Sequence, residues 1–128
     1  MKASYKIALA MLAGVAIGAA AVQGLHAQAK PPVYYIAEID VSNPEAYGKE
    51  YAPQAQATIK AAGGRILAAG AKPVGFDGEA PKSRVVVQLW DSVEKIQAWR
   101  NSPEYKAIRP IGEKYAKFRS FAIEGLAQ

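Results

Sequence analysis

The seven residues from Arg84 to Trp90, with the sequence RVVVQLW, constrain the fold more than any other stretch. β-Branched and aromatic residues favour a strand, and strand side chains alternate between two faces. The alternation gives two largely apolar faces, with Val85, Val87 and Leu89 on one and Val86, Gln88 and Trp90 on the other. A strand of this kind is covered on both sides. The sequence therefore predicts a covering layer on each face, and it leaves open which face meets helices.

Two helices are predicted directly after this strand. Asp91 is expected to cap the first one, since Glu94 follows three residues later. Apolar residues then recur at helical spacing, at Val93, Ile96 and Trp99. Ser102-Pro103-Glu104 predicts the start of the second helix, because serine caps helices and proline fits the first helical position. The apolar stripe of this second helix is expected to continue as far as Phe118.

Three further strands and one helix are predicted in the rest of the chain. The strands are Val33–Val41, Arg65–Ala69 and Arg119–Glu124, the last with Phe121 and Ile123 on its core face. The helix is expected to begin near Ser42-Asn43-Pro44, to be kinked or split at Pro53, and to end at Gly63-Gly64. The stretch 72–82 predicts a hairpin connection that turns at Asp77-Gly78.

The order strand, helix, strand, strand, helix, strand predicts an α+β fold. It is typical of a ferredoxin-like βαββαβ protomer, with a four-stranded antiparallel sheet and both helices on one face. The uncovered face would still carry apolar side chains, including Tyr34 and Ile36 from the first strand. Monomers rarely expose a large apolar patch. We therefore expect a homodimer in which the sheets of two protomers face each other.

Residues 1–29 have the pattern of a secretory signal peptide, and residues 30–128 would form the single folded domain. Lys2 and Lys6 precede an apolar run over residues 7–22, and Ala27-Gln28-Ala29 supplies an Ala-x-Ala site. The alternative is a retained membrane anchor, but the run is shorter than the roughly 20 residues that a span needs. We expect cleavage after Ala27 or Ala29, a periplasmic or secreted location, and no stable membrane anchor afterwards.

Two residue types that carry much of enzyme chemistry are missing from the predicted mature chain. The sequence has no cysteine, and its one histidine, His26, lies in the leader. Disulfides, thiolate nucleophiles, a Ser-His-Asp triad, His-ligated haem and ordinary zinc sites are therefore excluded, and we expect no metal and no cofactor. Basic and acidic residues are interleaved, and two of the lysines behind the net charge of +5 belong to the leader. No nucleic-acid partner is expected.

Several short motifs together resemble a known bacterial family. They are Asn43-Pro44-x-x-Tyr47, Gly63-Gly64-Arg65, Asp77-Gly78, the strand Val85–Trp90, Ala98-Trp99, Ser102-Pro103-Glu104-Tyr105 and Glu124-Gly125. Over about residues 33–126 the chain resembles the domain of unknown function thirteen-thirty (DUF1330) family, of the dimeric α/β-barrel superfamily. The resemblance implies a ferredoxin-like protomer whose sheet packs on that of a second protomer, and it implies no established activity. Relatives often have Glu in place of Asp77 and Arg in place of Gly112.

Candidate ligand-binding side chains can be named, although no catalytic residue can. They are Tyr34, Glu38, Arg65, Asp77, Trp90, Tyr105 and Arg109. A carboxylate such as Glu38 or Asp40 can act as a base when its pKa is raised, and Asp77 with Glu79 could form an acid/base pair. The arginines could hold a carboxylate ligand. For each residue a structural role is the alternative: a solvated strand edge, a turn, a surface ion pair or an aromatic anchor.

Two functions fit these observations. The first is a binding or structural module, a homodimer that holds a small apolar or amphipathic molecule. The alternative is a cofactor-independent enzyme, an isomerase or oxygenase acting on a small organic substrate, which rests on superfamily analogy alone. An enzyme would require Tyr34, Glu38, Arg65 or Asp77 to meet in one pocket.

Overall fold

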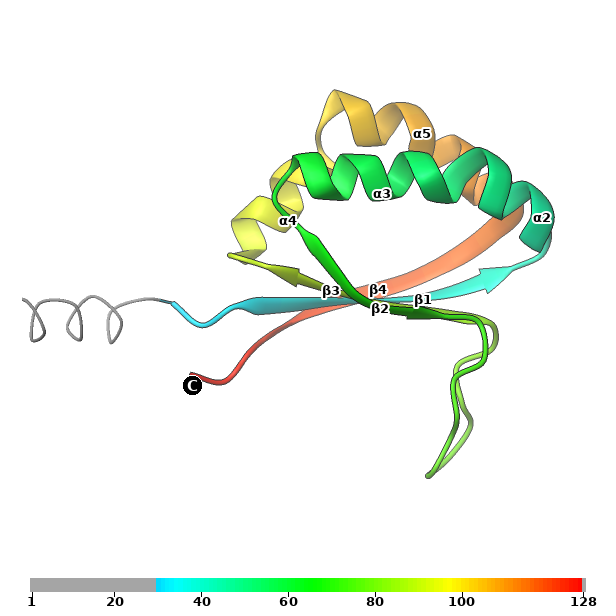
Figure 1. Cartoon of the computed structure of the whole chain (residues 1–128), viewed down its shortest axis with the longest axis horizontal. Coiled ribbons are helices and arrows are strands. Elements are labelled where there is room, and N and C mark those ends of the chain that lie inside the picture. The colour runs from blue at the N-terminus through cyan, green and yellow to red at the C-terminus, as the bar shows by residue number, and fades with distance from the viewer. Residues whose placement is uncertain (1–29, 128) are drawn as a thin grey trace, which may run out of the picture. The chain divides into compact units, whose positions relative to one another are not determined.

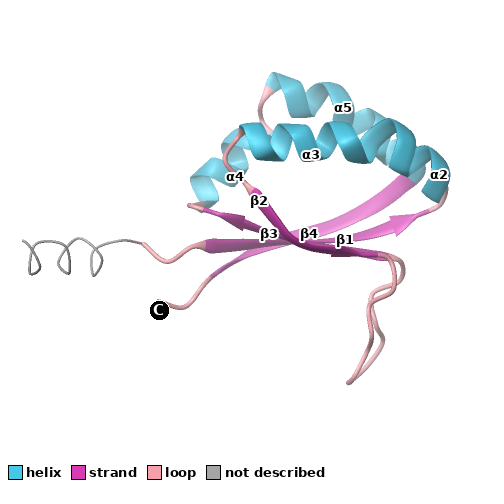
Figure 2. Ribbon diagram, in the orientation of Figure 1, coloured by secondary structure: helices cyan, strands magenta, loops and turns pink. Residues whose placement is uncertain are grey.

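A computed structural model describes residues 30–127 as an antiparallel sheet with its helices on one face (Figures 1 and 2). The elements are β1 (Val33–Val41), α2 (Pro44–Ala46), the π-helical turn η1 (Tyr47–Tyr51), α3 (Ala52–Ala61), β2 (Arg65–Gly70), β3 (Arg84–Trp90), α4 (Val93–Arg100), α5 (Pro103–Tyr115) and β4 (Ala116–Glu124). The predicted ferredoxin-like order is confirmed. The signal peptide predicted for residues 1–29 lies outside the described residues.

The four strands lie in the order β2-β3-β1-β4, and each neighbouring pair is antiparallel. β1 is central, so that Ile36 lies opposite Val87 of β3 and Phe121 of β4. A register shift between Ile66 and Ala68 interrupts the pairing of the edge strand β2. Between residues 30 and 127, no helix is both long enough and apolar enough to cross a membrane.

The face of the sheet that meets the helices carries the core. It includes Val33, Tyr35, Ala37 and Ile39 from β1, and Val86, Gln88 and Trp90 from β3, all buried. The structure thus settles which face of β3 the helices cover. Trp90 is only 1 % exposed, and its indole N–H donates to Oε1 of Gln88 over 2.8 Å. That bond gives both polar groups a partner inside the core.

The opposite face of the sheet, here called the outer face, presents three rows of side chains across the strands. Running from β2 to β4, the rows are Arg65, Leu89, Tyr34 and Ile123; then Ala68, Val87, Ile36 and Phe121; then Gly70, Val85, Glu38 and Arg119. The prediction that Phe121 and Ile123 face the protomer core is therefore wrong, since they are 44 % and 56 % exposed. They pair with Ile36 and Tyr34 and share their side of the sheet.

Two other local predictions are also wrong, for identifiable reasons. The closing strand begins at Ala116, not Arg119, because β1 pairs with Ala116, Lys117 and Phe118 and draws them out of the helical stripe. The cap of α4 is Ser92, whose hydroxyl accepts from the Lys95 N–H, whereas Asp91 lies 3.8 Å from the Lys95 ammonium group. Serine, threonine and aspartate have similar preferences for the N-cap position. The sequence alone therefore cannot decide between two adjacent candidates such as Asp91 and Ser92.

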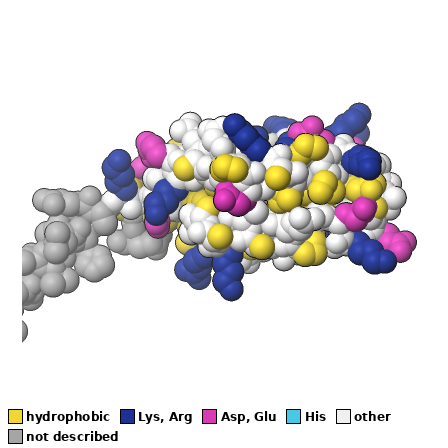
Figure 3. Space-filling model, turned by 90° about the horizontal axis from the view of Figure 1, so that it is seen from above, with side chains coloured by type: hydrophobic (Ala, Val, Ile, Leu, Met, Phe, Trp, Pro, Cys, Tyr) yellow, Lys and Arg dark blue, Asp and Glu magenta, His cyan; other side chains and the backbone are white. Residues whose placement is uncertain are grey.

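The caps and turns at Ser102, Gly63 and Gly78 lie where the sequence predicts them. Ser102 caps α5 by accepting from the Tyr105 N–H, with Pro103 in its first turn. Gly63 ends α3 with a left-handed φ of 98°, and Gly78 turns the β2–β3 connection with a φ of 71°. Seen from the helix side, basic and acidic side chains are interspersed among apolar ones (Figure 3).

Candidate functional site

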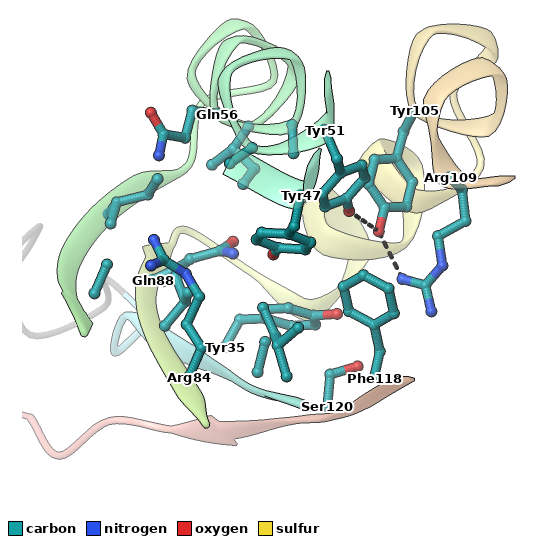
Figure 4. Close-up of a pocket in the computed structure, with 18 of the residues that line it drawn as sticks. Tyr35, Tyr47, Tyr51, Gln56, Arg84, Gln88, Tyr105, Arg109, Phe118 and Ser120 are labelled. Atoms are coloured by element: carbon teal, nitrogen blue, oxygen red, sulfur yellow. Dashed lines mark hydrogen bonds between the residues drawn. The ribbon is translucent and has the colours of Figure 1, made fainter. Parts of the chain in front are cut away.

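A cavity of about 50 Å³ lies between the helices and the inner face of the sheet (Figure 4). By the usual size of a buried water site, it holds about three waters or the head of a small ligand. Its walls come from β1, η1, α3, β3, α5 and β4, and include Tyr35, Tyr47, Tyr51, Gln88, Tyr105 and Phe118. Exposed lining residues, Gln56 on α3 with Ile66 and Ala69 on β2, mark an opening at the sheet edge.

The π-helical turn η1 places two tyrosines in this cavity. Tyr47 and Tyr51 are both buried, and their ring centroids are 5.2 Å apart. A π-helix has more than four residues per turn, so residues four apart point in nearly the same direction. Pro53 follows in the first turn of α3 and has no N–H to donate to the preceding turn. The predicted disturbance at Pro53 is confirmed, and it takes the form of this π turn. Such turns are frequent at functional sites.

A hydrogen-bonded chain of Tyr51, Tyr105 and Arg109 closes one side of the cavity (Figure 4). The two hydroxyl oxygens are 3.2 Å apart, and Nη1 of Arg109 donates to the Tyr105 oxygen over 2.8 Å. The guanidinium group can only donate. The two phenols therefore share one hydrogen bond between them, and one of their two protons remains available to the cavity.

Arg109 is held from three sides. Its Nε donates to Glu113 over 2.9 Å, and its guanidinium carbon lies 3.9 Å from the centroid of the Phe118 ring. Burial alone would lower the pKa of this guanidinium, but the hydrogen bonds with Tyr105 and Glu113 outweigh burial and raise it. Arg109 therefore keeps its charge, and Glu113 compensates it.

Burial keeps the phenols of Tyr47 and Tyr51 protonated. It raises the pKa of Tyr47, against the opposing effect of the Arg84 charge. It also raises the pKa of Tyr51 well above the ordinary range, and the neighbouring Tyr105 adds to this effect. Near neutral pH these groups therefore act as hydroxyl donors and not as phenolates.

Arg84 and Gln88 face the cavity from β3, across Tyr47 from the Tyr51–Tyr105 pair (Figure 4). Arg84 is partly buried, and within residues 30–127 it has no ion-pair partner. Ser83, directly before it, accepts from the Val41 N–H and donates to the Ile39 carbonyl oxygen. These bonds fasten the start of β3 to the end of β1 and so fix the position of Arg84.

The structure divides the seven predicted site residues between three places. Tyr105 and Arg109 line the cavity, while Trp90 is packed in the core beside it. Tyr34, Glu38 and Arg65 lie on the outer face, separated from the cavity by the sheet itself. Asp77 is exposed in the 72–82 connection. The enzyme hypothesis requires Tyr34, Glu38, Arg65 or Asp77 to meet in one pocket. None of them lines this cavity, and Glu38 alone of the four borders a different, shallow depression beside β1 and β4.

The predicted carboxylates have their own surroundings. Glu38 accepts a hydrogen bond from Arg119 over 2.9 Å in an ion pair on the outer face. With Asp40 and Glu79 it borders a shallow depression that also contains Lys82 and Lys117. In the described part of the chain, no three His, Cys, Asp or Glu side chains gather where they could hold a metal ion.

The polar cavity residues that sequence reasoning missed include Tyr47, Tyr51, Arg84 and Gln88. The signal for the tyrosines was present, since both belong to the apolar stripe of the first helix, where they resemble ordinary core residues. Gln88 stands out in the sequence as the polar residue within an apolar strand face. A buried polar side chain at such a position requires a partner, and this was the available clue.

Comparisons with known proteins bear on the family and the fold. A family model described as "Domain of unknown function (DUF1330)" matches residues 32–126. A search of curated proteins gives no match. Among solved structures, methylated RPA0582, a protein from Rhodopseudomonas palustris, is 16 % identical with a TM-score of 0.59, covering 76 % of this chain and 82 % of that one.

Two further solved structures share the architecture. SnoaB from Streptomyces nogalater, a cofactor-independent oxygenase, is 9 % identical with a TM-score of 0.57, covering 77 % of this chain and 96 % of its own. A dimeric protein of unknown function and ferredoxin-like fold from Bacteroides fragilis is 13 % identical with a TM-score of 0.52, covering 73 % and 96 %. At these identities the likeness establishes the fold alone.

Proposed function

This chain belongs to the DUF1330 family, and we propose that it is an exported, homodimeric protein that holds a small amphipathic molecule between its helices and its sheet. The observation that carries the proposal is the composition of the cavity wall. Aromatic and aliphatic side chains form most of the wall, while polar groups from β3, η1 and α5 converge on the same space. Ligand sites typically combine an apolar lining with a few fixed polar groups.

The Tyr47 hydroxyl is one group in the cavity that a ligand can bind. Tyr47 is only 6 % exposed, yet within residues 30–127 its hydroxyl makes no hydrogen bond to another side chain or to the backbone. Among the described residues no side-chain oxygen or nitrogen atom is both fully buried and unpaired, so the Tyr47 oxygen is accessible from the cavity that it lines. A ligand atom or a water in the cavity can therefore form a hydrogen bond with it, and the site is suited to receive a polar group.

The enzyme alternative has less support from this geometry. A cofactor-independent reaction that begins by proton removal needs a group that can accept the proton. The lining contains no carboxylate and no imidazole, and burial raises the pKa of Tyr47 and Tyr51. Oxygenase activity is a property of SnoaB, and the fold that the two proteins share does not transfer it. We therefore favour binding over catalysis.

The outer face of the sheet supports the homodimer. Two adjacent rows combine Leu89, Val87 and Ile36 with Phe121 and Ile123, and no helix within residues 30–127 covers them. A surface of this kind is typical of protein interfaces. The Bacteroides fragilis protein with the same fold is dimeric, which agrees with a second copy as the covering layer.

Replacing Ala37 by leucine is expected to abolish binding while the fold is retained. Ala37 lies on the cavity floor, and three added carbon atoms would occupy most of the roughly 50 Å³. The matched control is Ala107→Leu on the exposed side of α5, which adds the same atoms outside the cavity. Native mass spectrometry of protein purified from its own host should find a small-molecule adduct on the wild type and on Ala107→Leu. An adduct that persists on Ala37→Leu, or a wild type without one, would contradict the proposal.

Export is expected to shorten the chain at its N-terminus. The motive is the pattern of residues 1–29, with two lysines, an apolar run and an Ala-x-Ala site. Intact-mass analysis of the periplasmic fraction should give a species that begins at Gln28 or Lys30. Replacing Ala27 and Ala29 by aspartate should block processing. A full-length species confined to the membrane would show that the segment is an anchor.

A further inference from the structure

We infer that the cavity ligand is a small planar organic monoanion, a carboxylate or an enolate, whose oxygen atoms are held by Arg84, Gln88 and the cavity hydroxyls. The inference rests on the proposed binding function and names the chemical class of its ligand. Three independent properties of the cavity support it: the kind of hydrogen-bonding group that faces it, its charge, and the shape of its walls.

Two polar groups that face the cavity, the Gln88 amide and the Arg84 guanidinium, can offer only hydrogen-bond donors to a ligand. The indole N–H of Trp90 can only donate, so it fixes Oε1 of Gln88 as its acceptor over 2.8 Å. The Gln88 amide is thereby oriented with its NH₂ group left for the cavity that it lines. Arg84 also has donors alone. A ligand that uses both residues must present acceptor atoms.

The tyrosine hydroxyl groups supply further hydrogen-bond donors to the cavity. Arg109 donates to the Tyr105 oxygen, and Tyr105 shares a single hydrogen bond with Tyr51. One phenolic proton of this pair is therefore left for a ligand, and the Tyr47 proton is a second. Since burial raises the pKa of both Tyr47 and Tyr51, these protons stay in place near neutral pH.

The charge balance of the lining selects a monoanion. The lining contains two arginines and no aspartate or glutamate. Glu113 compensates Arg109 at 2.9 Å, whereas Arg84 has no such partner among the described residues. One uncompensated positive charge therefore faces the cavity. Taking a partly buried charge out of water is unfavourable without a counter-charge, and a single ligand anion would supply one.

The aromatic walls select a flat ligand. The aromatic rings that line the space include Tyr35, Tyr47, Tyr51 and Phe118. Some of these rings pack on one another, and the ring centroids of Tyr51 and Phe118 are 5.7 Å apart. Aromatic faces and edges pack best on other planar groups. A carboxylate or enolate conjugated to a ring or double bond has the matching shape, with its oxygens in the plane. Its head of about three heavy atoms fits the space of about 50 Å³, and the rest of the ligand would extend toward the opening beside Gln56, Ile66 and Ala69.

Three probes of nearly one shape and different charge test the inference: benzoate, benzamide and benzamidinium. Binding to the ¹⁵N-labelled mature protein would be followed by NMR at neutral pH. The signals are the backbone amide chemical shifts of Tyr47, Gln88 and Tyr105 and the Arg84 Nε–H resonance. We expect benzoate to bind at least about tenfold more tightly than benzamide, because charge-assisted hydrogen bonds are roughly twice as strong as neutral ones. Benzamidinium should not shift these signals.

The matched variants are Arg84→Gln and Lys106→Gln, each of which removes one positive charge. Lys106 is exposed on α5 and does not line the cavity. Arg84→Gln should reduce the affinity for benzoate to that for benzamide, and Lys106→Gln should leave the preference unchanged. Equal binding of benzoate and benzamide at the cavity would overturn the anion class and leave the binding function standing. No cavity shift with any probe would overturn the inference. The binding function is decided separately, by an adduct that is present on the wild type and Ala107→Leu and absent from Ala37→Leu.

Discussion

Val87→Asp is expected to dissociate the proposed homodimer and to destabilise the protomer at the same time. Val87 lies at the centre of the outer face, paired with Ile36 on one side and Ala68 on the other. In a sheet-to-sheet dimer an aspartate there would be buried without a partner. The cost of an unpaired buried charge is several kcal/mol. A loss of about 3 kcal/mol already weakens an association by more than about a hundredfold.

The expected loss is large because the interface of the proposed dimer would contribute much of the stability. Obligate interfaces bury on the order of 2,000 Å², and apolar burial contributes roughly 25 cal/mol per Å² before the entropy of association is subtracted. A short chain without disulfides has few other sources of stability. The melting temperature of the wild type should therefore rise with protein concentration.

Light scattering at micromolar concentration, combined with thermal melts at several concentrations, measures both effects. The control is Gln97→Asp, which places the same residue on the exposed surface of α4. It should remain dimeric and lose only the few tenths of a kcal/mol that helix propensity predicts. A monomeric wild type with a concentration-independent melting temperature would contradict the proposed dimer. A Val87→Asp variant that stays dimeric would contradict the sheet-to-sheet interface.

Gly64→Ala is expected to lower the free energy of unfolding by about 2–3 kcal/mol, although it adds a single methyl group. A Cβ at this position would lie 2.5 Å from two carbon atoms of the Trp90 ring and 2.8 Å from Ile59. Trp90 is almost completely buried and hydrogen-bonded to Gln88. It therefore has little room to move away. Near-UV circular dichroism should change together with the midpoint of urea unfolding.

Gly48→Ala is the matched control, because it makes the same change in open space. No heavy atom lies within 4 Å of a Cβ built at Gly48, which is in the π-helical turn. Alanine there should be neutral or stabilise the protein by up to about 1 kcal/mol, since glycine is a poor helix former. If Gly64→Ala were as well tolerated as Gly48→Ala, the close contact between residue 64 and Trp90 would be wrong.

Local patterns in the sequence were sufficient for most of the fold. The period of two in β1 and β3, the serine and proline at the start of α5, and the left-handed glycines at 63 and 78 each depend on a few neighbouring residues. Physical rules for such features involve short distances along the chain. For this reason their order, and with it the ferredoxin-like topology, could be predicted without any tertiary information.

Local patterns failed where two elements compete for the same residues. Phe118 continues the helical stripe of α5 in the sequence, yet it pairs with Ile39 of β1 and belongs to β4. The hydrogen bonds that decide its state come from a strand that lies far away in the chain. Likewise the alternation in β4 predicts that Phe121 and Ile123 share a face, but it wrongly makes this the core face. Only the pairing with Ile36 and Tyr34 shows that this face is turned away from the helices.

The candidate site was within reach of the sequence only in part. Composition alone excluded histidine and cysteine chemistry from residues 30–128, and the candidate residues included Tyr105 and Arg109. The partners of these two residues depended on the tertiary structure. Tyr51 and Tyr105 are 54 positions apart in the chain and 3.2 Å apart in space. No local rule joins them, because their contact requires the packing of α5 against η1 over the completed sheet.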